Sequence, residues 1–477
     1  MRNNAFKRAT LAIVCAGGML AGATTHAADW LSLQGTEPEG AAERARIWGF
    51  VQPEFVSTDG STLAAGPWAG QEAIFNSIGP DLETNEQFNI RRARLGVRGT
   101  GFPLDSNVNY FLLAEFGNNG VTRPGGGSVK VTDASVTLNH LKKFTRVRVG
   151  QFKTPGSEDG LQAIHVHNYN NFSIVADQLL LERFLDADGA AACRAADLDV
   201  DPAVDPDAGN KLAYLGLCQG GNQLNGSVGA YRDIGVQLFN TFTLKDGPGK
   251  YPWEVSYAFM VGNGNGIARG DNDDHRDLYA YLSAGQVFGG KGPRRQDWKL
   301  YGWYHDGKRH IFDTTGTPDT WGSKRFDRDR WGIGGTLRWQ KYRLYGEYIE
   351  ADGMIFNASD GAAVPGSISN DGSQVSGFNM LTDNKADGWY LDFGYKVLPN
   401  LELDVRYDEL NRGTEGAASI LREFERWTVG AQYFFNKKSR ITLNYEFRDT
   451  TAPGAAGADR IVAGTDDLFS AQLLVIF

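Results

Sequence analysis

Basic side chains on two short stretches of this sequence have the type and spacing to bind anions. The stretches are "NIRRARLGVRG", residues 89–99, and "RVRVGQFK", residues 146–153. A guanidinium offers several N–H donors in one plane and grips a carboxylate or a tetrahedral oxyanion through two hydrogen bonds. The candidate residues are Arg92, Arg94, Arg98, Arg146, Arg148 and Lys153.

The arginines in these stretches are separated by small apolar residues at a period of two. In the first stretch Ala93, Leu95 and Val97 alternate with the basic positions. Successive side chains of a β-strand point to opposite faces, so each stretch predicts a strand with one basic face and one apolar face. The local pattern does not indicate what the basic face contacts. That has to be inferred from the rest of the chain.

Sixteen segments of the chain alternate in this way, and each is close to the roughly 9 to 11 residues with which a tilted strand crosses a bilayer. Their number is even. They centre on "IWGFVQPEFV", "IRRARLGVRG", "VNYFLLAEF", "VTDASVTL", "RVRVGQFK", "DIGVQLFNTF", "WEVSYAFMVG", "LYAYLSAGQVF", "WKLYGWYH", "WGIGGTLRW", "YRLYGEYIE", "WYLDFGYKV", "LELDVRYDEL", "RWTVGAQYFF", "ITLNYEFRD" and "LFSAQLLVIF".

The connections between these segments alternate between short and long. Short ones include "QK" at 340–341 and "LPN" at 398–400, and the clearest long ones are 58–86, 154–228, 306–327, 351–386 and 410–424. Outer-membrane barrels have short periplasmic turns and long external loops. The pattern therefore predicts an all-β fold, a 16-stranded antiparallel transmembrane β-barrel that occupies residues 46–477.

The N-terminal residues have the features of an export signal. A basic start precedes an apolar run from Leu11 to about Ala23, and Thr25-His26-Ala27 fits a cleavage site, so we predict a signal peptide at 1–27 and a short periplasmic segment at 28–45. Removing its three basic residues takes the formal charge from −9 to −12, which argues against a nucleic-acid partner. We expect the protein in a bacterial outer membrane.

Other residues that could bind a metal or react occur in patterns that are less specific. Cys193 and Cys218 would meet an oxidising compartment, which favours a disulfide between them. His165 and His167 form a conceivable metal pair, but polar loop histidines are the better interpretation because no further ligands follow at a defined spacing. There is no "GxSxG" nucleophile motif, and we expect no catalytic residues, no metal and no cofactor. An enzyme with a triad built from distant parts of the chain is the least favoured alternative.

The size of the barrel bears on what the arginines do, because barrels of 16 to 18 strands enclose an aqueous channel. The basic faces would then line a lumen and the apolar faces would contact lipid. Acidic residues share the lumen by parity, which leaves two interpretations open: arginine–carboxylate pairs that stiffen the wall, or a path for anions. The inward acids are Glu115, Asp133, Asp233, Glu254, Glu347 and Glu446.

Together, "RRARLGVRG" and "VRVGQFKTP" resemble the phosphate-selective porins of the O/P type, a resemblance that extends in strand order to the terminal Phe477. It implies an outer-membrane pore, usually a trimer, whose third external loop folds inward and whose Arg and Lys side chains conduct anions. That loop would be about 154–228 here. Two features depart from the family: Gly156 stands where an aromatic residue is common, and residues 186–211 carry seven aspartates.

We therefore predict a porin for passive diffusion of small anions, phosphate or a related oxyanion, through an Arg/Lys-lined constriction. Its expected partners are these anions, outer-membrane lipid and lipopolysaccharide, and two further copies of the chain in a homotrimer. The alternatives are a general or cation-preferring porin, which the acidic charge favours, and an adhesion or structural barrel, which the long loops favour.

Overall fold

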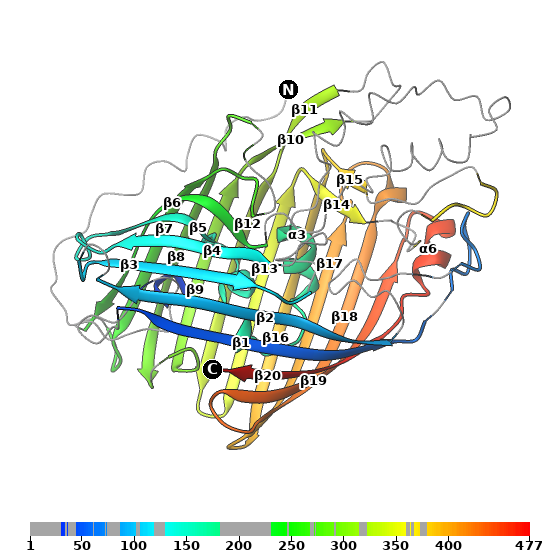
Figure 1. The fold of residues 1–477 in the computed structure, drawn as a ribbon. Coiled ribbons are helices and arrows are strands. Elements are labelled where there is room, and N and C mark those ends of the chain that lie inside the picture. The colour runs from blue at the N-terminus through cyan, green and yellow to red at the C-terminus, as the bar shows by residue number, and fades with distance from the viewer. Residues whose placement is uncertain are drawn as a thin grey trace.

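Sixteen antiparallel strands close into one barrel in the computed structural model of the chain (Figure 1). The structure describes residues 30–33, 36, 44–60, 62–71, 73, 86–101, 105–118, 129–181, 230–245, 248–267, 271, 273–290, 292–313, 322–358, 363, 367–372 and 379–477. The predicted signal peptide, Cys193, Cys218 and the acidic segment 186–211 lie outside these residues. No helix among them is long and apolar enough to cross a membrane.

Each barrel strand corresponds to one of the sixteen alternating segments of the sequence, in the same order. Every strand is hydrogen-bonded to its neighbour along the chain, and β1 pairs with β20 to close the sheet. The strands are β1 (Arg46–Thr58), β2 (Glu86–Thr100), β3 (Val108–Glu115), β4 (Lys130–Leu138), β5 (Arg146–Lys153), β6 (Arg232–Leu244), β7 (Trp253–Gly262), β8 (Asp277–Gly289), β9 (Gln296–Asp306), β12 (Asp329–Trp339), β13 (Tyr342–Asp352), β16 (Lys385–Leu398), β17 (Leu401–Arg412), β18 (Arg422–Phe434), β19 (Ser439–Thr451) and β20 (Leu468–Ile476).

The remaining elements lie in the connections and near the N-terminus. The long connections predicted at 306–327 and 351–386 are not plain loops, since each contains a two-stranded sheet, β10–β11 or β14–β15. These elements are α1 (Trp30–Leu33), α2 (Glu158–Leu161), a 3-10 turn (Ile164–Val166), α3 (Ile174–Leu180), β10 (Lys308–Asp313), β11 (Gly322–Asp327), β14 (Ile355–Ala358), β15 (Asn379–Leu381), a second 3-10 turn (Ala418–Ile420) and α6 (Ala456–Val462).

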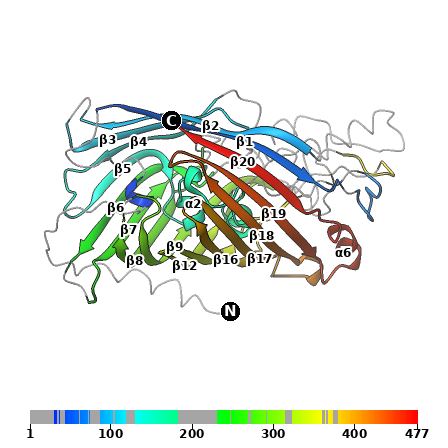
Figure 2. The ribbon, with the colours of Figure 1, turned by 90° about the horizontal axis from the view of Figure 1, so that it is seen from below.

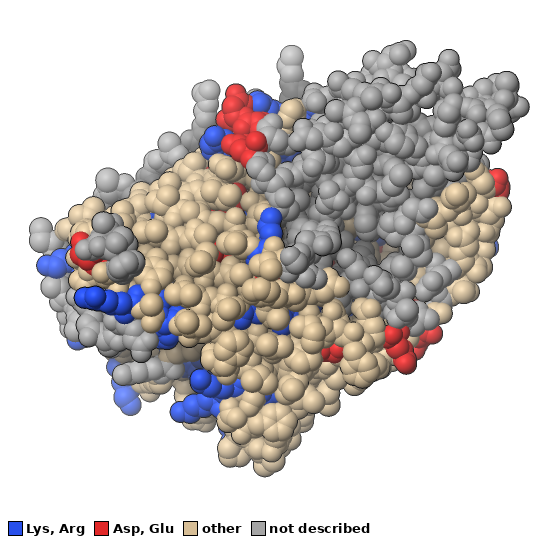
Figure 3. Space-filling model, in the orientation of Figure 1, with Lys and Arg blue, Asp and Glu red and all other residues tan. Residues whose placement is uncertain are grey.

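The predicted apolar faces of the strands form the outer surface of the barrel. Phe259 on β7, Leu391 on β16 and Val429 on β18 are exposed, whereas their polar neighbours Glu254 and Asp392 are buried on the inside. In Figure 3 uncharged residues cover most of the wall, and Lys and Arg side chains gather along its lower edge. An apolar exterior around a polar interior is the arrangement that a membrane barrel needs.

The seam between β1 and β20 holds the C-terminal residue in place. The backbone of Gly49 exchanges two hydrogen bonds with Phe477, of 3.2 and 3.0 Å. A Cβ atom at Gly49 would meet the Phe477 ring at 2.6 Å and the Arg94 carbonyl oxygen at 2.4 Å. Only glycine fits here, because the terminal ring packs directly against the backbone of β1.

Two segments lie inside the barrel. Residues 154–181 leave the end of β5 and fold inward, and α3 packs against β13, β16 and β17 (Figure 2). Residues 30–33 of the predicted periplasmic segment are also inside, since Trp30 and Leu31 share one hydrophobic cluster with Leu161 and Trp303. The chain itself therefore occupies part of the barrel interior at this level.

Candidate functional site

The five predicted arginines all point into the barrel. Arg92, Arg94 and Arg98 are on the inner face of β2, and Arg146 and Arg148 are on the inner face of β5. The strands from β1 to β6 form one continuous section of wall, which we call the β1–β6 wall. The parity of the sequence thus predicts the orientation of these side chains correctly.

These cations have different partners on the β1–β6 wall. Arg94 pairs with Glu115 at 2.7 Å, the structural ion pair that the sequence left open. Arg92, by contrast, has no ion-pair partner among the described residues, and its guanidinium donates to the amide oxygen of Gln52 at 3.3 Å. Lys153 donates to the carbonyl oxygens of Gly160 and Gln162, at 2.8 and 2.7 Å.

Two further inward cations on this wall were missed by the sequence analysis. Arg91 pairs with Glu54 at 2.7 Å, because a β-bulge shifts the register between Gln52 and Pro53 and turns two successive arginines to the same side. Arg232, the first residue of β6, pairs with Asp133 at 3.0 Å. Proline cannot donate to the ladder, so Pro53 is the one signal that could have pointed to the bulge.

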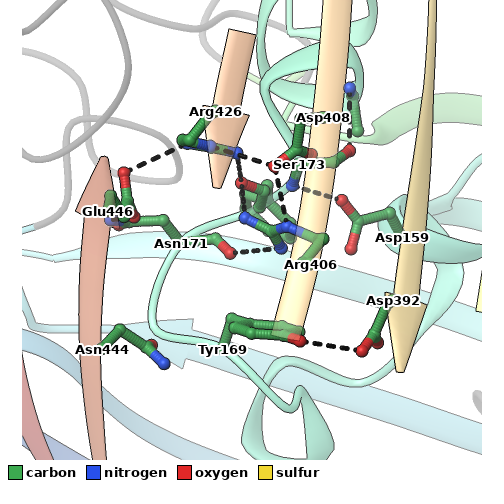
Figure 4. Close-up of polar contacts among 12 residues, drawn as sticks. Asp159, Tyr169, Asn171, Ser173, Asp392, Arg406, Asp408, Arg426, Asn444 and Glu446 are labelled. Carbon is green, nitrogen blue, oxygen red and sulfur yellow. Dashed lines mark hydrogen bonds and ion pairs between the residues drawn. The ribbon is translucent and has the colours of Figure 1, made fainter. Parts of the chain in front are cut away.

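The strands from β12 to β19 form the opposite section, the β12–β19 wall, and their arginines hold the inward segment. Arg406 donates to the carbonyl oxygens of Asn171 and Phe172, at 3.2 and 3.0 Å, and Arg426 reaches Phe172 at 2.8 Å (Figure 4). The same two guanidiniums share Asp408. Each of them therefore both pairs with a wall carboxylate and clamps the backbone of the segment.

Side chains of the segment add to this attachment. The Tyr169 hydroxyl donates to Asp392 at 2.8 Å, and the Asn171 amide donates to Glu446 at 2.6 Å (Figure 4). Ser157 donates to Glu347, and Lys299 on β9 donates to Glu158. Residues 154–181 are thus bonded across the barrel to the β12–β19 wall and to the adjacent strand β9.

A contact between Asp159 and His167 holds the two halves of the segment together. Asp159 lies 3.1 Å from His167 and also accepts the backbone N–H of Ser173 at 2.8 Å. Burial alone would raise the pKa of the Asp159 carboxyl, but the charge and hydrogen bond of His167 outweigh it and bring that pKa to about 2. Asp159 is therefore ionised throughout the ordinary pH range.

The two histidines considered as a metal pair point to different surroundings. His165 packs against the rings of Trp48 and Phe50, at 5.8 and 5.2 Å between centroids. Burial, then the charges of Arg440 and Arg94, lower the pKa of His165 to about 3, whereas His167 is engaged with Asp159. The described residues hold no group of three or more metal-ligating side chains.

The arrangement leaves little solvent beside most of the predicted residues. Arg92 is 3 % exposed and Arg94 6 %, whereas Arg98 and Arg146 are half-buried. A wall of positive groups crowded by an inward segment is a place where an anion would be attracted and would meet few waters. Chemically the site can bind anions by hydrogen bonds and charge.

The family resemblance found in the sequence is confirmed over part of the chain. Residues 75–175 match the family described as phosphate-selective porin O and P, and this range contains all six predicted site residues. No curated protein matches the chain. The match covers β2 to β5 and most of the described inward segment.

Solved structures share the barrel. The anion-selective porin from Comamonas acidovorans is 12 % identical, with a TM-score of 0.50, over 91 % of this chain and 99 % of that one. OmpT of Vibrio cholerae is 12 % identical, with a TM-score of 0.46, over 91 % and 97 %. OmpF of Salmonella typhi, in complex with daunomycin, is 14 % identical with the same score and coverage. The Comamonas likeness shows a common porin fold, and with the family match it supports an outer-membrane channel.

Proposed function

We propose that the protein is an outer-membrane porin through which small anions, phosphate or a related oxyanion, diffuse passively. The observation that carries this proposal is the β1–β6 wall, where Arg92 and Lys153 are buried cations held only by neutral oxygens among the described residues. A fixed positive charge without its own carboxylate attracts an anion and repels cations.

The other interior cations support the proposal in a different way. Arg94 and Arg232 form ion pairs with Glu115 and Asp133. These carboxylates compensate part of the positive charge and weaken the attraction of both arginines for a passing anion. Conduction requires sites that are strong enough to admit an ion and weak enough to release it. A row of partly compensated arginines beside an uncompensated one meets both requirements, and the crowding of the inward segment predicts a narrow path.

The setting of the channel is part of the same proposal. We propose that residues 1–27 are removed on export, that the short turns face the periplasm and that three copies assemble in the membrane beside lipopolysaccharide. The apolar belt of Phe259, Leu391 and Val429 supports the membrane setting. No catalytic step is required, because diffusion through a channel needs only the gradient of the solute.

The test is single-channel recording in a planar bilayer under a KCl gradient, before and after phosphate is added. We expect a reversal potential of the sign for chloride permeation and a chloride current that phosphate blocks. The Arg92→Gln variant should weaken both effects, whereas the control Lys437→Gln, an exposed lysine of a short turn, should leave them unchanged. Cation selectivity in the wild-type pore would reject the proposal and favour a cation-preferring porin.

A further inference from the structure

The segment that contains α1 is bonded to two of the predicted anion-path arginines. Arg148 donates to the carbonyl oxygen of Leu31 at 3.0 Å. Arg98 donates to the carbonyl oxygens of Leu33 and Thr36, at 3.2 and 2.7 Å. Carbonyl oxygens of the chain itself thus accept hydrogen bonds from guanidinium groups that an oxyanion would use.

Apolar contacts hold the same segment in place. Trp30 and Leu31 are 5 % and 2 % exposed, and their cluster includes Phe239 of β6 and Leu161 of the inward segment 154–181. The Ser32 hydroxyl lies 3.0 Å from the hydroxyl of Thr241 on β6. Burial of these two large apolar side chains stabilises the segment in this position.

The position of the segment along the barrel follows from the strands that it touches. Arg98 is close to the end of β2, Arg148 is close to the start of β5, and Thr241 is close to the end of β6. The short turns join the strands at this end. In Figure 2, α1 lies inside the ring of strands beside β5 and β6. The segment therefore occupies the interior near the end that we assign to the periplasm.

We propose that residues 30–33 and 36 form an internal plug, an intramolecular ligand of Arg98 and Arg148 that narrows the periplasmic half of the channel and competes there with permeating oxyanions. This inference deepens the proposed function and rests on it for the identity of the competing ion. The plug itself predicts a difference in conductance, which can be measured whatever the ion selectivity is.

The first variant fixes the segment in its seat. Ser32→Cys with Thr241→Cys, in a Cys193→Ser/Cys218→Ser background, places two thiols where two hydroxyls now lie 3.0 Å apart. The oxidised form should keep the conductance of the wild-type pore. Failure of the two cysteines to form a disulfide in the folded barrel would mean that the segment is not seated, and would overturn the proposal.

The second variant releases the segment by removing its apolar contacts. A helical turn with its side chains is about 10 Å across, so Trp30→Ala/Leu31→Ala should raise the conductance on the order of two-fold. Phosphate should then block the chloride current at a lower concentration, because Arg98 and Arg148 become available to it. The control is Leu282→Ala, since Leu282 is exposed on the outer face.

The outcomes separate the two proposals. If the oxidised and released forms conduct equally, the segment lies in the barrel without acting as a plug, and this inference fails while anion selectivity can still hold. If the wild-type pore prefers cations but the released form conducts more, the plug stands and the anion-porin function fails. A shift in gel mobility on heating verifies that each variant has formed a folded barrel.

Discussion

The two facing walls of the barrel both carry buried arginines, but these arginines have different kinds of partners. On the β1–β6 wall Arg92 contacts a neutral amide, whereas Arg94 pairs with Glu115. On the β12–β19 wall Arg406 and Arg426 share Asp408 and bind the backbone of the inward segment. The number of arginines in a lumen therefore does not measure its attraction for anions, since the partners of each arginine decide how much of its charge is uncompensated.

The largest effect is expected from removing one of the arginine clamps on the β12–β19 wall. Arg426→Gln loses the bonds to Phe172, Asp408 and Glu446. We expect the free energy of unfolding in lipid vesicles to fall by about 3 kcal/mol and the conductance to rise as the segment loosens. Arg448→Gln is the matched control, because Arg448 pairs with Glu446 without touching the segment. Equal effects of the two variants would contradict the clamp.

Acid should loosen the same segment from within. The folded-state pKa of Asp159, about 2, lies below the ordinary value of 3.8, so its stabilisation is complete above pH 4 and is lost as the pH falls toward 2. The shift corresponds to about 2 kcal/mol. Conductance should rise over this window, and Asp159→Asn should abolish the rise. An identical pH dependence in the variant would assign the effect to another group.

The hydrogen bond of the Tyr169 hydroxyl allows a smaller test of how firmly the inward segment is held to the β12–β19 wall. Tyr169→Phe removes the hydrogen bond to Asp392 and keeps the ring on which Arg406 stacks at 4.5 Å. We expect a loss of about 1 kcal/mol in the free energy of unfolding, measured by urea titration in vesicles. Tyr304→Phe, on the exposed outer face, serves as the control and should be neutral.

The smallest effect on stability belongs to the residue that we expect to matter most for ions. Arg92→Gln breaks no ion pair, so the free energy of unfolding should change by less than about 1 kcal/mol. Arg94→Gln should cost more, about 2 kcal/mol, because the buried carboxylate of Glu115 loses the compensating charge of Arg94. Urea titrations of both variants would show this order, and a larger loss for Arg92→Gln would remove the contrast between the walls.

The sequence predicts the barrel well because a period of two is a local property. The alternation around Leu95 and Val429 is enough to assign a face to each side chain, and sixteen such segments define the wall. Arg91 is not predicted by this alternation because the register shift at Pro53 reverses the parity of β2. Before the shift the odd positions point inward, and from Arg92 onward the even positions do.

The interior is harder to predict because its contacts are between residues far apart in the chain. Nothing near Phe172 in the sequence indicates that Arg426 binds its carbonyl oxygen, and nothing near Leu31 indicates Arg148. Trp30 and Leu31 follow the predicted cleavage site, and no pattern in the sequence distinguishes them from a short terminal segment outside the barrel. Only the packed structure shows that they are buried inside the barrel.

The seam between Gly49 and Phe477 also has a consequence for the order of folding. The first and last barrel strands pair across more than four hundred residues, so the ring of hydrogen bonds cannot be completed until the end of the chain has arrived. Contacts of such long range carry a large loop-closure cost and form slowly. Until then two strand edges would be unpaired and could form hydrogen bonds with other chains. The newly exported polypeptide would therefore need chaperones to prevent aggregation on its way to the membrane.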